Sequence, residues 1–172
     1  MDSKEPLATN ALPGNPTANR DRLRDLTAND KSPVRQFLAL VVDDSIDNVA
    51  VLSLDLQYEG YKVVTASNGE EAVTVASLTN PDIILMDLSM PRMDGFEATR
   101  RIKEVDSLKA VPVIAITAFS TDGFRRAAYD VGIAGYLTKP IDSTQMHLLI
   151  RRLLGPQDNN VSGDLSSGAI LK

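Results

Sequence analysis

Acidic residues follow directly after two apolar runs of the sequence. Phe37–Val42 is followed by Asp43 and Asp44, and Ile83–Met86 is followed by Asp87. Unbroken apolar runs of this length are typical of parallel strands that are buried on both faces. In open α/β sheets, binding sites form at the carboxyl ends of such strands. We therefore interpret Asp87 as the reactive group, which residues at the ends of the other strands assist.

Two further apolar runs end in residues of a different chemical kind. Thr117 follows Val113–Ile116, and Lys139 comes two residues after the short run Ala134–Leu137. Because the carboxyl ends of parallel strands meet at one edge of a sheet, these side chains should join the acidic ones. We expect three carboxylates, one hydroxyl and one ammonium group around a single crevice.

This set of groups suits phosphoryl chemistry. Neighbouring carboxylates raise one another's pKa unless a cation neutralises them, and Mg²⁺ is the divalent ion that prefers a few oxygen ligands and retained waters. Mg²⁺ and Lys139 would balance the charge on a phosphoryl group, and Thr117 would donate a hydrogen bond to it. A carboxylate such as that of Asp87 can itself be the nucleophile and form an acyl phosphate.

Segments typical of strands and of helices alternate between residues 37 and 154. The expected strands are residues 37–42, 61–66, 83–86, 113–116 and 134–137. The expected helices are residues 46–59, 70–78, 96–105, 122–131 and 143–154. This alternation predicts an α/β fold, a doubly wound five-stranded parallel sheet with helices on both faces.

The spacing of apolar residues indicates which helix faces are buried. The first helix should begin after a Ser45 cap and bury one face, formed by Ile46, Val49, Leu52 and Leu56. The last helix should begin after Asp142 or Ser143.

Composition excludes several classes of protein. The 172-residue chain has a net charge of −5, no cysteine and no apolar run near the roughly 18 residues that span a bilayer. These features argue against nucleic-acid binding, disulfides, thiolate metal sites and membrane insertion, and they favour a cytoplasmic protein. Residues 1–36 and 156–172 are rich in Pro, Asn, Gly and Ser, so we expect a disordered N-terminal extension and a flexible C-terminal tail around a domain at 37–155. The tail is too short for an output domain, which favours a stand-alone protein.

Five short motifs carry a resemblance to a known family. They are Val42-Asp43-Asp44, Leu85-Met86-Asp87, Met90-Pro91-Arg92-Met93-Asp94-Gly95, Ile116-Thr117-Ala118 and Gly135-Tyr136-Leu137-Thr138-Lys139-Pro140. In order and spacing they resemble the receiver domain of bacterial response regulators, and the stand-alone chemotaxis receivers in particular. The resemblance covers about two-thirds of the chain and implies a flavodoxin-like fold with strand order 2-1-3-4-5.

The resemblance assigns roles to the acidic residues. Asp87 would accept a phosphoryl group from a sensor histidine kinase or a phosphotransfer protein. Asp43, Asp44, Asp87 and the backbone carbonyl of Ser89 would bind Mg²⁺. The protein would catalyse only its own phosphorylation and slow dephosphorylation, so it would not be an enzyme with turnover.

Further residues would turn phosphorylation into a signal. Lys139 would pair with the phosphoryl group and form a cis bond to Pro140, Thr117 would move towards the phosphoryl oxygens, and Tyr136 would turn inward behind Thr117. These contacts would bias an existing equilibrium and change the partner-binding face at residues 122–154. The expected partners are the phosphoryl donor and a downstream protein, with no direct nucleic acid and no membrane insertion. The protein would be a monomer or a phosphorylation-dependent dimer.

Two positions bear on the lifetime of the phosphoryl group. In this family, the second residue after the phosphorylated Asp and the second after the Thr tune hydrolysis, and here they are Ser89 and Phe119. Neither offers a carboxylate or an amide that would orient an attacking water. We therefore expect slow hydrolysis.

Three other functions fit the sequence less well. A phosphatase of the haloacid-dehalogenase type would need Asp-x-Asp-x-Thr after its first strand, where this chain has Asp43-Asp44-Ser45-Ile46-Asp47. A receiver that works only by binding would not need the full set of phosphorylation residues. A flavin carrier would need a phosphate-binding loop rich in Ser, Thr and Gly after the first strand. We interpret the single histidine, His147, as an ordinary helix residue rather than a phosphoryl relay.

Overall fold

Strands and helices alternate through the described part of the chain. The computed structural model describes residues 35–155, so the expected extension and tail at residues 1–34 and 156–172 lie outside it. The strands are β1 (Leu38–Val42), β2 (Lys62–Ala66), β3 (Ile83–Asp87), β4 (Val113–Thr117) and β5 (Gly135–Thr138). The helices are α2 (Ile46–Tyr58), α3 (Gly69–Thr79), α4 (Gly95–Glu104), α5 (Asp122–Asp130) and α6 (Ser143–Leu154). A short 3₁₀ helix, η1 (Asp106–Leu108), was not predicted.

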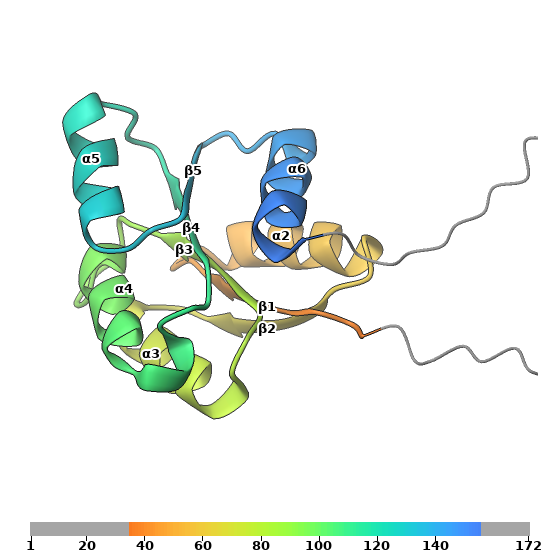
Figure 1. The fold of residues 1–172 in the computed structure, drawn as a ribbon. Coiled ribbons are helices and arrows are strands. Elements are labelled where there is room, and N and C mark those ends of the chain that lie inside the picture. Colours follow the sequence, from red (N-terminus) through yellow and green to blue (C-terminus); the bar gives the residue numbers. More distant parts are fainter. Residues whose placement is uncertain (1–34, 156–172) are drawn as a thin grey trace, which may run out of the picture. The chain divides into compact units, whose positions relative to one another are not determined.

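The five strands form one parallel sheet in the order β2-β1-β3-β4-β5, as the resemblance implied (Figure 1). The register decides which residues meet at its carboxyl edge. Val42 pairs with Met86, so the residues that follow them, Asp43 and Asp87, lie side by side. Asp87 in turn pairs with Ile116 of β4, whose next residue is Thr117.

Each face of the sheet is covered by its own group of helices (Figure 1). On one face, α2 and α6 pack against the sheet through Leu52, Leu56, Met146 and Ile150. On the other face, α3, α4 and α5 pack through alanines and Ile102. All five residues of β3 and of β4 are buried. For Ile83–Met86 this confirms the burial that the apolar run predicted. The strand ends that carry Asp87 and Thr117 therefore lie in the buried centre of the sheet.

The predicted apolar face of α2 was wrong at its first residue. Leu52 and Leu56 are buried, whereas Ile46 is 81% exposed. At about 100° per residue, Ile46 lies about 120° around the helix from Leu52, outside the face that the sheet covers. Ser45 caps this helix as expected, and Asp142 rather than Ser143 caps α6.

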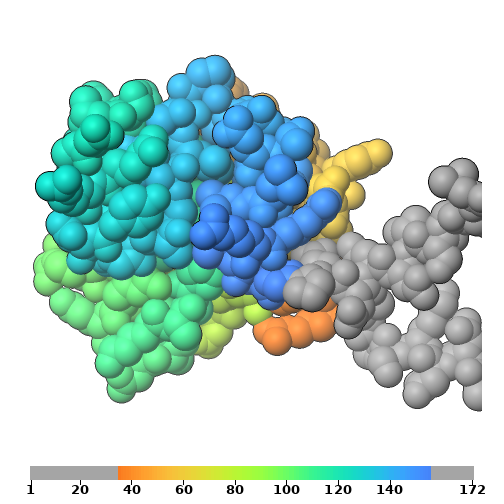
Figure 2. Space-filling view, turned by 45° about the horizontal axis from the view of Figure 1, so that its top comes forward, coloured from red at the N-terminus to blue at the C-terminus, as the bar shows by residue number. Residues whose placement is uncertain are grey.

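The segment from α5 to α6 forms one stretch of surface. In the space-filling view, residues 122–154 run without a break from α5, in teal, to α6, in blue (Figure 2). Edge strand β5 lies between these two helices in the sequence and carries Tyr136 and Thr138. This is the face on which we expected a partner to bind.

Candidate functional site

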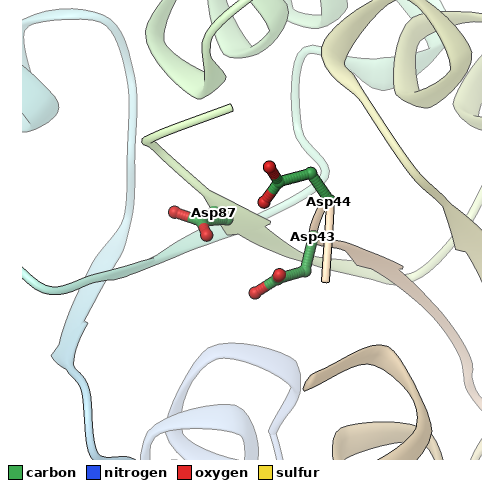
Figure 3. A group of neighbouring side chains, drawn as sticks. All are labelled: Asp43, Asp44 and Asp87. Atoms are coloured by element: carbon green, nitrogen blue, oxygen red, sulfur yellow. The ribbon is translucent and has the colours of Figure 1, made fainter. Parts of the chain in front are cut away.

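Three carboxylates meet at the carboxyl edge of the sheet, where the sequence predicted them. Asp43 and Asp44 follow β1, Asp87 ends β3, and one oxygen from each lies within 4.8 Å of the others (Figure 3). Asp43 and Asp87 are only 2% and 4% exposed, whereas Asp44 is exposed. The cluster thus has two fixed, buried members and one that faces solvent.

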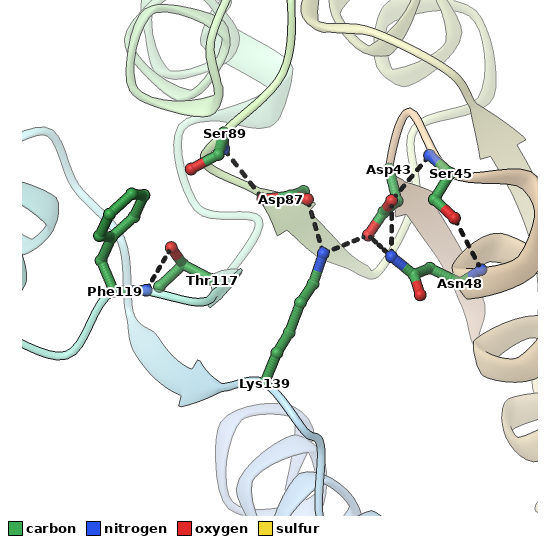
Figure 4. Close-up of polar contacts among 8 residues, drawn as sticks. All are labelled: Asp43, Ser45, Asn48, Asp87, Ser89, Thr117, Phe119 and Lys139. Atoms are coloured by element: carbon green, nitrogen blue, oxygen red, sulfur yellow. Dashed lines mark hydrogen bonds and ion pairs between the residues drawn. The ribbon is translucent and has the colours of Figure 1, made fainter.

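Lys139 supplies the positive charge of the site. Its Nζ donates to Asp43 Oδ2 at 2.8 Å and to Asp87 Oδ2 at 2.6 Å (Figure 4). It reaches them from the end of β5, and the bond between Lys139 and Pro140 is cis, as the resemblance implied. One ammonium group therefore bridges the two buried carboxylates.

The electrostatics of the site follow from burial and from this bridge. Burial raises the pKa of Asp87, and the Asp43 charge adds to the rise, while hydrogen bonds from Lys139 and from the Ser89 backbone oppose it. For Lys139, burial lowers the pKa, but hydrogen bonds to the two carboxylates outweigh that effect and raise it overall. The site therefore keeps Lys139 protonated and makes the ionised form of Asp87 less favourable than it is in water.

Backbone amides orient both buried carboxylates. The Ser89 N–H donates to Asp87 Oδ1 at 2.9 Å, and the Ser45 N–H donates to Asp43 Oδ1 at 2.9 Å. In each case the donor lies two residues after the acid, where the chain turns out of its strand. These two bonds fix the direction of each carboxylate.

One side chain that contacts this cluster was missed by the sequence analysis. Asn48, in the first turn of α2, donates from Nδ2 to both carboxylate oxygens of Asp43, at 3.0 Å and 3.1 Å (Figure 4). The available signal was an asparagine about one helical turn after the Asp43-Asp44-Ser45 motif, because asparagine is a poor helix former.

The loop after β3 rests directly on the backbone of Asp87. A Cβ atom on Gly95 would lie 2.2 Å from the Asp87 carbonyl oxygen, so only glycine fits there. Within the loop, Arg92 has a φ of +69°, and the Met93 N–H donates to the Pro91 carbonyl at 3.0 Å. This bond and this φ are those of a tight three-residue turn with a strained central residue.

The predicted switch residues meet at Phe119. Thr117 is fully buried, and its Oγ1 accepts a hydrogen bond from the Phe119 N–H at 3.2 Å rather than bonding to Asp87 (Figure 4). The half-buried Tyr136 donates from its hydroxyl to the Phe119 carbonyl at 2.6 Å, and the Arg125 guanidinium lies 5.2 Å from the Tyr136 ring centre. The backbone of one residue thus joins the two side chains, while their switch roles stay a prediction.

His147 lies elsewhere in the domain. Its Nε2 is 3.2 Å from Asp55 Oδ1, so it joins α6 to α2. Within residues 35–155 it makes no hydrogen bond to the carboxylate cluster, and its reading as an ordinary helix residue stays a prediction.

The donor set of this site fits a hard divalent cation. The cluster offers three carboxylates close together, two of them held in direction, with a third that is free to adjust. Cations of this kind, Mg²⁺ among them, take carboxylate and carbonyl oxygens. Asp43, Asp44 and Asp87 would be the side-chain ligands. Within residues 35–155 they are the one group of His, Cys, Asp or Glu side chains with this spacing.

The chain matches known proteins over the part that contains this site. A family model described as "Response regulator receiver domain" matches residues 39–151. Response regulator PleD of Caulobacter vibrioides is 41% identical over 114 residues, which is 66% of this chain and 25% of PleD. The chain therefore spans about a quarter of the length of PleD. The polar-differentiation response regulator DivK of Brucella anthropi is 34% identical over 116 residues, which is 67% of this chain and 94% of DivK.

A solved structure shows the same architecture with a metal ion. It is the receiver domain of the sensor histidine kinase PA1611 from Pseudomonas aeruginosa, with a magnesium ion coordinated in its active-site cleft. It aligns with a TM-score of 0.66 at 33% identity, over 71% of this chain and all of that one.

Within residues 35–155, no helix has the length and apolar character needed to cross a membrane.

Proposed function

Because this chain belongs to the response regulator receiver family of two-component systems, we propose that it accepts a phosphoryl group on Asp87 from a sensor histidine kinase or a phosphotransfer protein. The observation that carries the proposal is the Lys139 bridge. A lysine placed within 2.8 Å of two buried carboxylates is already positioned to neutralise the anion that the reaction brings in. A purely structural role does not explain this arrangement, because three carboxylates surround a single ammonium group and the cluster keeps an excess of negative charge.

The proposed step is an in-line displacement. An oxygen of ionised Asp87 attacks the phosphorus atom, and the bond from phosphorus to the imidazole nitrogen of the phosphorylated histidine in the donor protein breaks. The donor imidazole keeps the electron pair of that bond and takes a proton from solvent, and Asp87 becomes an acyl phosphate. Lys139 stays protonated throughout and turns from Asp43 towards the phosphoryl oxygens.

We propose Mg²⁺ as the cofactor of this step. Asp43, Asp44, Asp87 and the carbonyl of Ser89 would hold it, and it would supply charge neutralisation between the acceptor and the phosphoryl oxygens. The magnesium ion coordinated in the PA1611 receiver domain supports this choice.

We propose that phosphorylation changes the face formed by residues 122–154. Thr117 now bonds to the Phe119 N–H. A phosphoryl group on Asp87 would give the Thr117 hydroxyl a strong acceptor to which it can donate. Turning the Thr117 side chain towards that acceptor would break its bond from the Phe119 N–H and would release Phe119 together with the Tyr136 hydroxyl bound to it. A downstream protein that binds only one of these two arrangements would then shift the equilibrium towards the arrangement that it binds. Cytoplasmic location and a phosphorylation-dependent dimer remain predictions.

The proposed protein is a phosphoacceptor and not an enzyme with turnover. Neither Ser89 nor Phe119 offers a carboxylate or an amide that could orient an attacking water molecule. Phe119 is 51% exposed, and the centre of its ring lies 5.0 Å from that of the Phe124 ring. We therefore propose that the acyl phosphate hydrolyses slowly. A phosphoryl lifetime of seconds at 25 °C would contradict this part of the proposal.

The test is the intact mass of the protein after incubation with acetyl phosphate and Mg²⁺. We expect the wild type to gain one phosphoryl group and the Asp87→Asn variant to gain none. Asp94→Asn is a matched control, because this exposed aspartate caps α4 on the same loop and asparagine caps equally well. Labelling of Asp87→Asn, or no labelling of the wild type with Mg²⁺ bound, would overturn the assignment.

A further inference from the structure

Asn48 makes the one uncharged side-chain contact to the carboxylate cluster within residues 35–155. Its Nδ2 lies 3.0 Å from Asp43 Oδ1 and 3.1 Å from Asp43 Oδ2, so a single amide group spans both oxygens. The other donors to Asp43 are the Ser45 N–H and the Lys139 ammonium group. Asn48 therefore contributes to the orientation of Asp43 without adding charge.

The hydrogen bonds to Asp43 account for an asparagine in the first turn of α2 better than helix propensity does. Asparagine is less favourable than alanine in a helix by about 0.6 kcal/mol. On another side, Asn48 borders a cavity of about 250 Å³, together with Leu52, Pro140 and Ile141. The side-chain hydrogen bonds that Asn48 makes within the described residues both go to Asp43.

The neutrality of Asn48 matters once the reaction proceeds. In the proposed step Lys139 leaves Asp43 for the phosphoryl oxygens, so Asp43 loses the cation at 2.8 Å. Its remaining donors are then the Ser45 N–H and Asn48. A positively charged side chain in place of Asn48 would compete with an incoming divalent cation for the same carboxylate, whereas an amide leaves that charge available.

We propose that Asn48 is a positioning residue that holds Asp43 in the direction required of a metal ligand. The inference rests on the Mg²⁺ site of the proposed function. Groups that hydrogen-bond a metal ligand typically change metal affinity by 10- to 100-fold when they are removed. We expect the lower end of that range, about tenfold, because Ser45 continues to orient Asp43.

The experiment measures Mg²⁺ affinity of the full chain by titration calorimetry, without any phosphoryl donor. The Asn48→Leu variant keeps the shape of the side chain and removes the donor, and the adjoining cavity gives leucine room. We expect its Kd to rise about tenfold while the far-UV circular dichroism spectrum stays unchanged. Asn68→Ala is the control, because it removes the asparagine that caps α3 away from the cluster and should leave the Kd within twofold.

A double-mutant cycle separates positioning from a general effect on the fold. If Asn48 acts through Asp43, then Asn48→Leu should change Mg²⁺ affinity little in a chain that already carries Asp43→Asn. Equal effects in both backgrounds would overturn the inference, and so would an Asn48→Leu variant that binds Mg²⁺ as the wild type does. A wild type that binds no Mg²⁺ would overturn the metal part of the proposed function and this inference with it. Normal Mg²⁺ binding without labelling by acetyl phosphate would count against the phosphoacceptor role alone.

Discussion

Replacing Asp87 with asparagine should make the unphosphorylated protein more stable, although it removes the central residue of the site. Two like charges lie near Asp87, each with an oxygen within 4.8 Å. With an effective dielectric constant of about 20, each repels it by about 3.5 kcal/mol. Lys139, at 2.6 Å, offsets about 6 kcal/mol on the same scale. These charge interactions nearly cancel.

Burial then decides the sign of the effect. The side chain of Asp87 is 6% exposed, and moving an ion out of water costs several kcal/mol. Asparagine avoids that cost, and its carbonyl oxygen can still accept from the Ser89 N–H and from Lys139. We expect Asp87→Asn to raise the free energy of unfolding by about 1–3 kcal/mol, because it keeps most hydrogen bonds and removes the buried charge.

Urea unfolding followed by circular dichroism measures this change, at pH 7.5 with EDTA. For an m-value of about 2 kcal/mol per molar urea, the midpoint should rise by about 0.5–1.5 M. Burial raises the pKa of Asp87 above its ordinary 3.8 in the folded protein, so the folded state binds that proton more tightly than the unfolded chain. The advantage of the variant should be full above the raised pKa and should disappear as the pH falls to about 4.

Two outcomes would refute this reasoning. One is an Asp87→Asn variant that unfolds at lower urea than the wild type in EDTA, which would mean that the Lys139 bridge outweighs the cost of burial. The other is an equal gain from Asp94→Asn, whose carboxylate is exposed. Saturating Mg²⁺ should reduce the difference, because it stabilises the wild type more than the variant.

Three further substitutions test the supports of the site. Gly95→Ala should destabilise the fold by about 2–4 kcal/mol in urea unfolding, because the new Cβ atom would lie 2.2 Å from the Asp87 carbonyl oxygen. Gly123→Ala is the control: a Cβ atom there would meet no atom within 4 Å, so this variant should be neutral or stabilising. Arg92→Gly should stabilise by about 1 kcal/mol because it removes the strain of a φ of +69°, and an unchanged midpoint would mean that the turn is relaxed. Asp142→Ala should cost about 1 kcal/mol in the same assay, since it removes the cap of α6, and no loss would show that the cap contributes little.

The alternation of strands and helices and the location of the site could be predicted because both depend on patterns along the sequence. The apolar run Ile83–Met86 identified β3 as a buried strand. Polar residues at the ends of such runs, Asp87 and Thr117 among them, then had to share one edge. The family motifs supplied the strand order and the cis bond before Pro140, which composition alone would not have revealed.

The features that were missed depend on angles and on contacts between distant side chains. Ile46 has the type of a buried residue and lies three residues before Val49, but it sits about 120° around α2 from Leu52, outside the face that the sheet covers. The contact of Asn48 with Asp43 depends on how the first turn of α2 leaves β1. The turn at Arg92 has no glycine or asparagine to signal its positive φ. In each case the residue type was compatible with several geometries, and the packing of the whole domain selected one.

The Lys139 bridge also bears on how the protein is made. Lys139 lies 96 residues after Asp43 and 52 residues after Asp87 in the sequence. At about 5–20 residues per second, a ribosome needs several seconds to add the second of these stretches. During that interval the carboxylates at the ends of β1 and β3 can meet without their counter-charge, and the arrival of β5 supplies it. A nascent or truncated chain that ends before β5 should therefore fail to react with acetyl phosphate, so that labelling of Asp87 reports completion of the whole sheet.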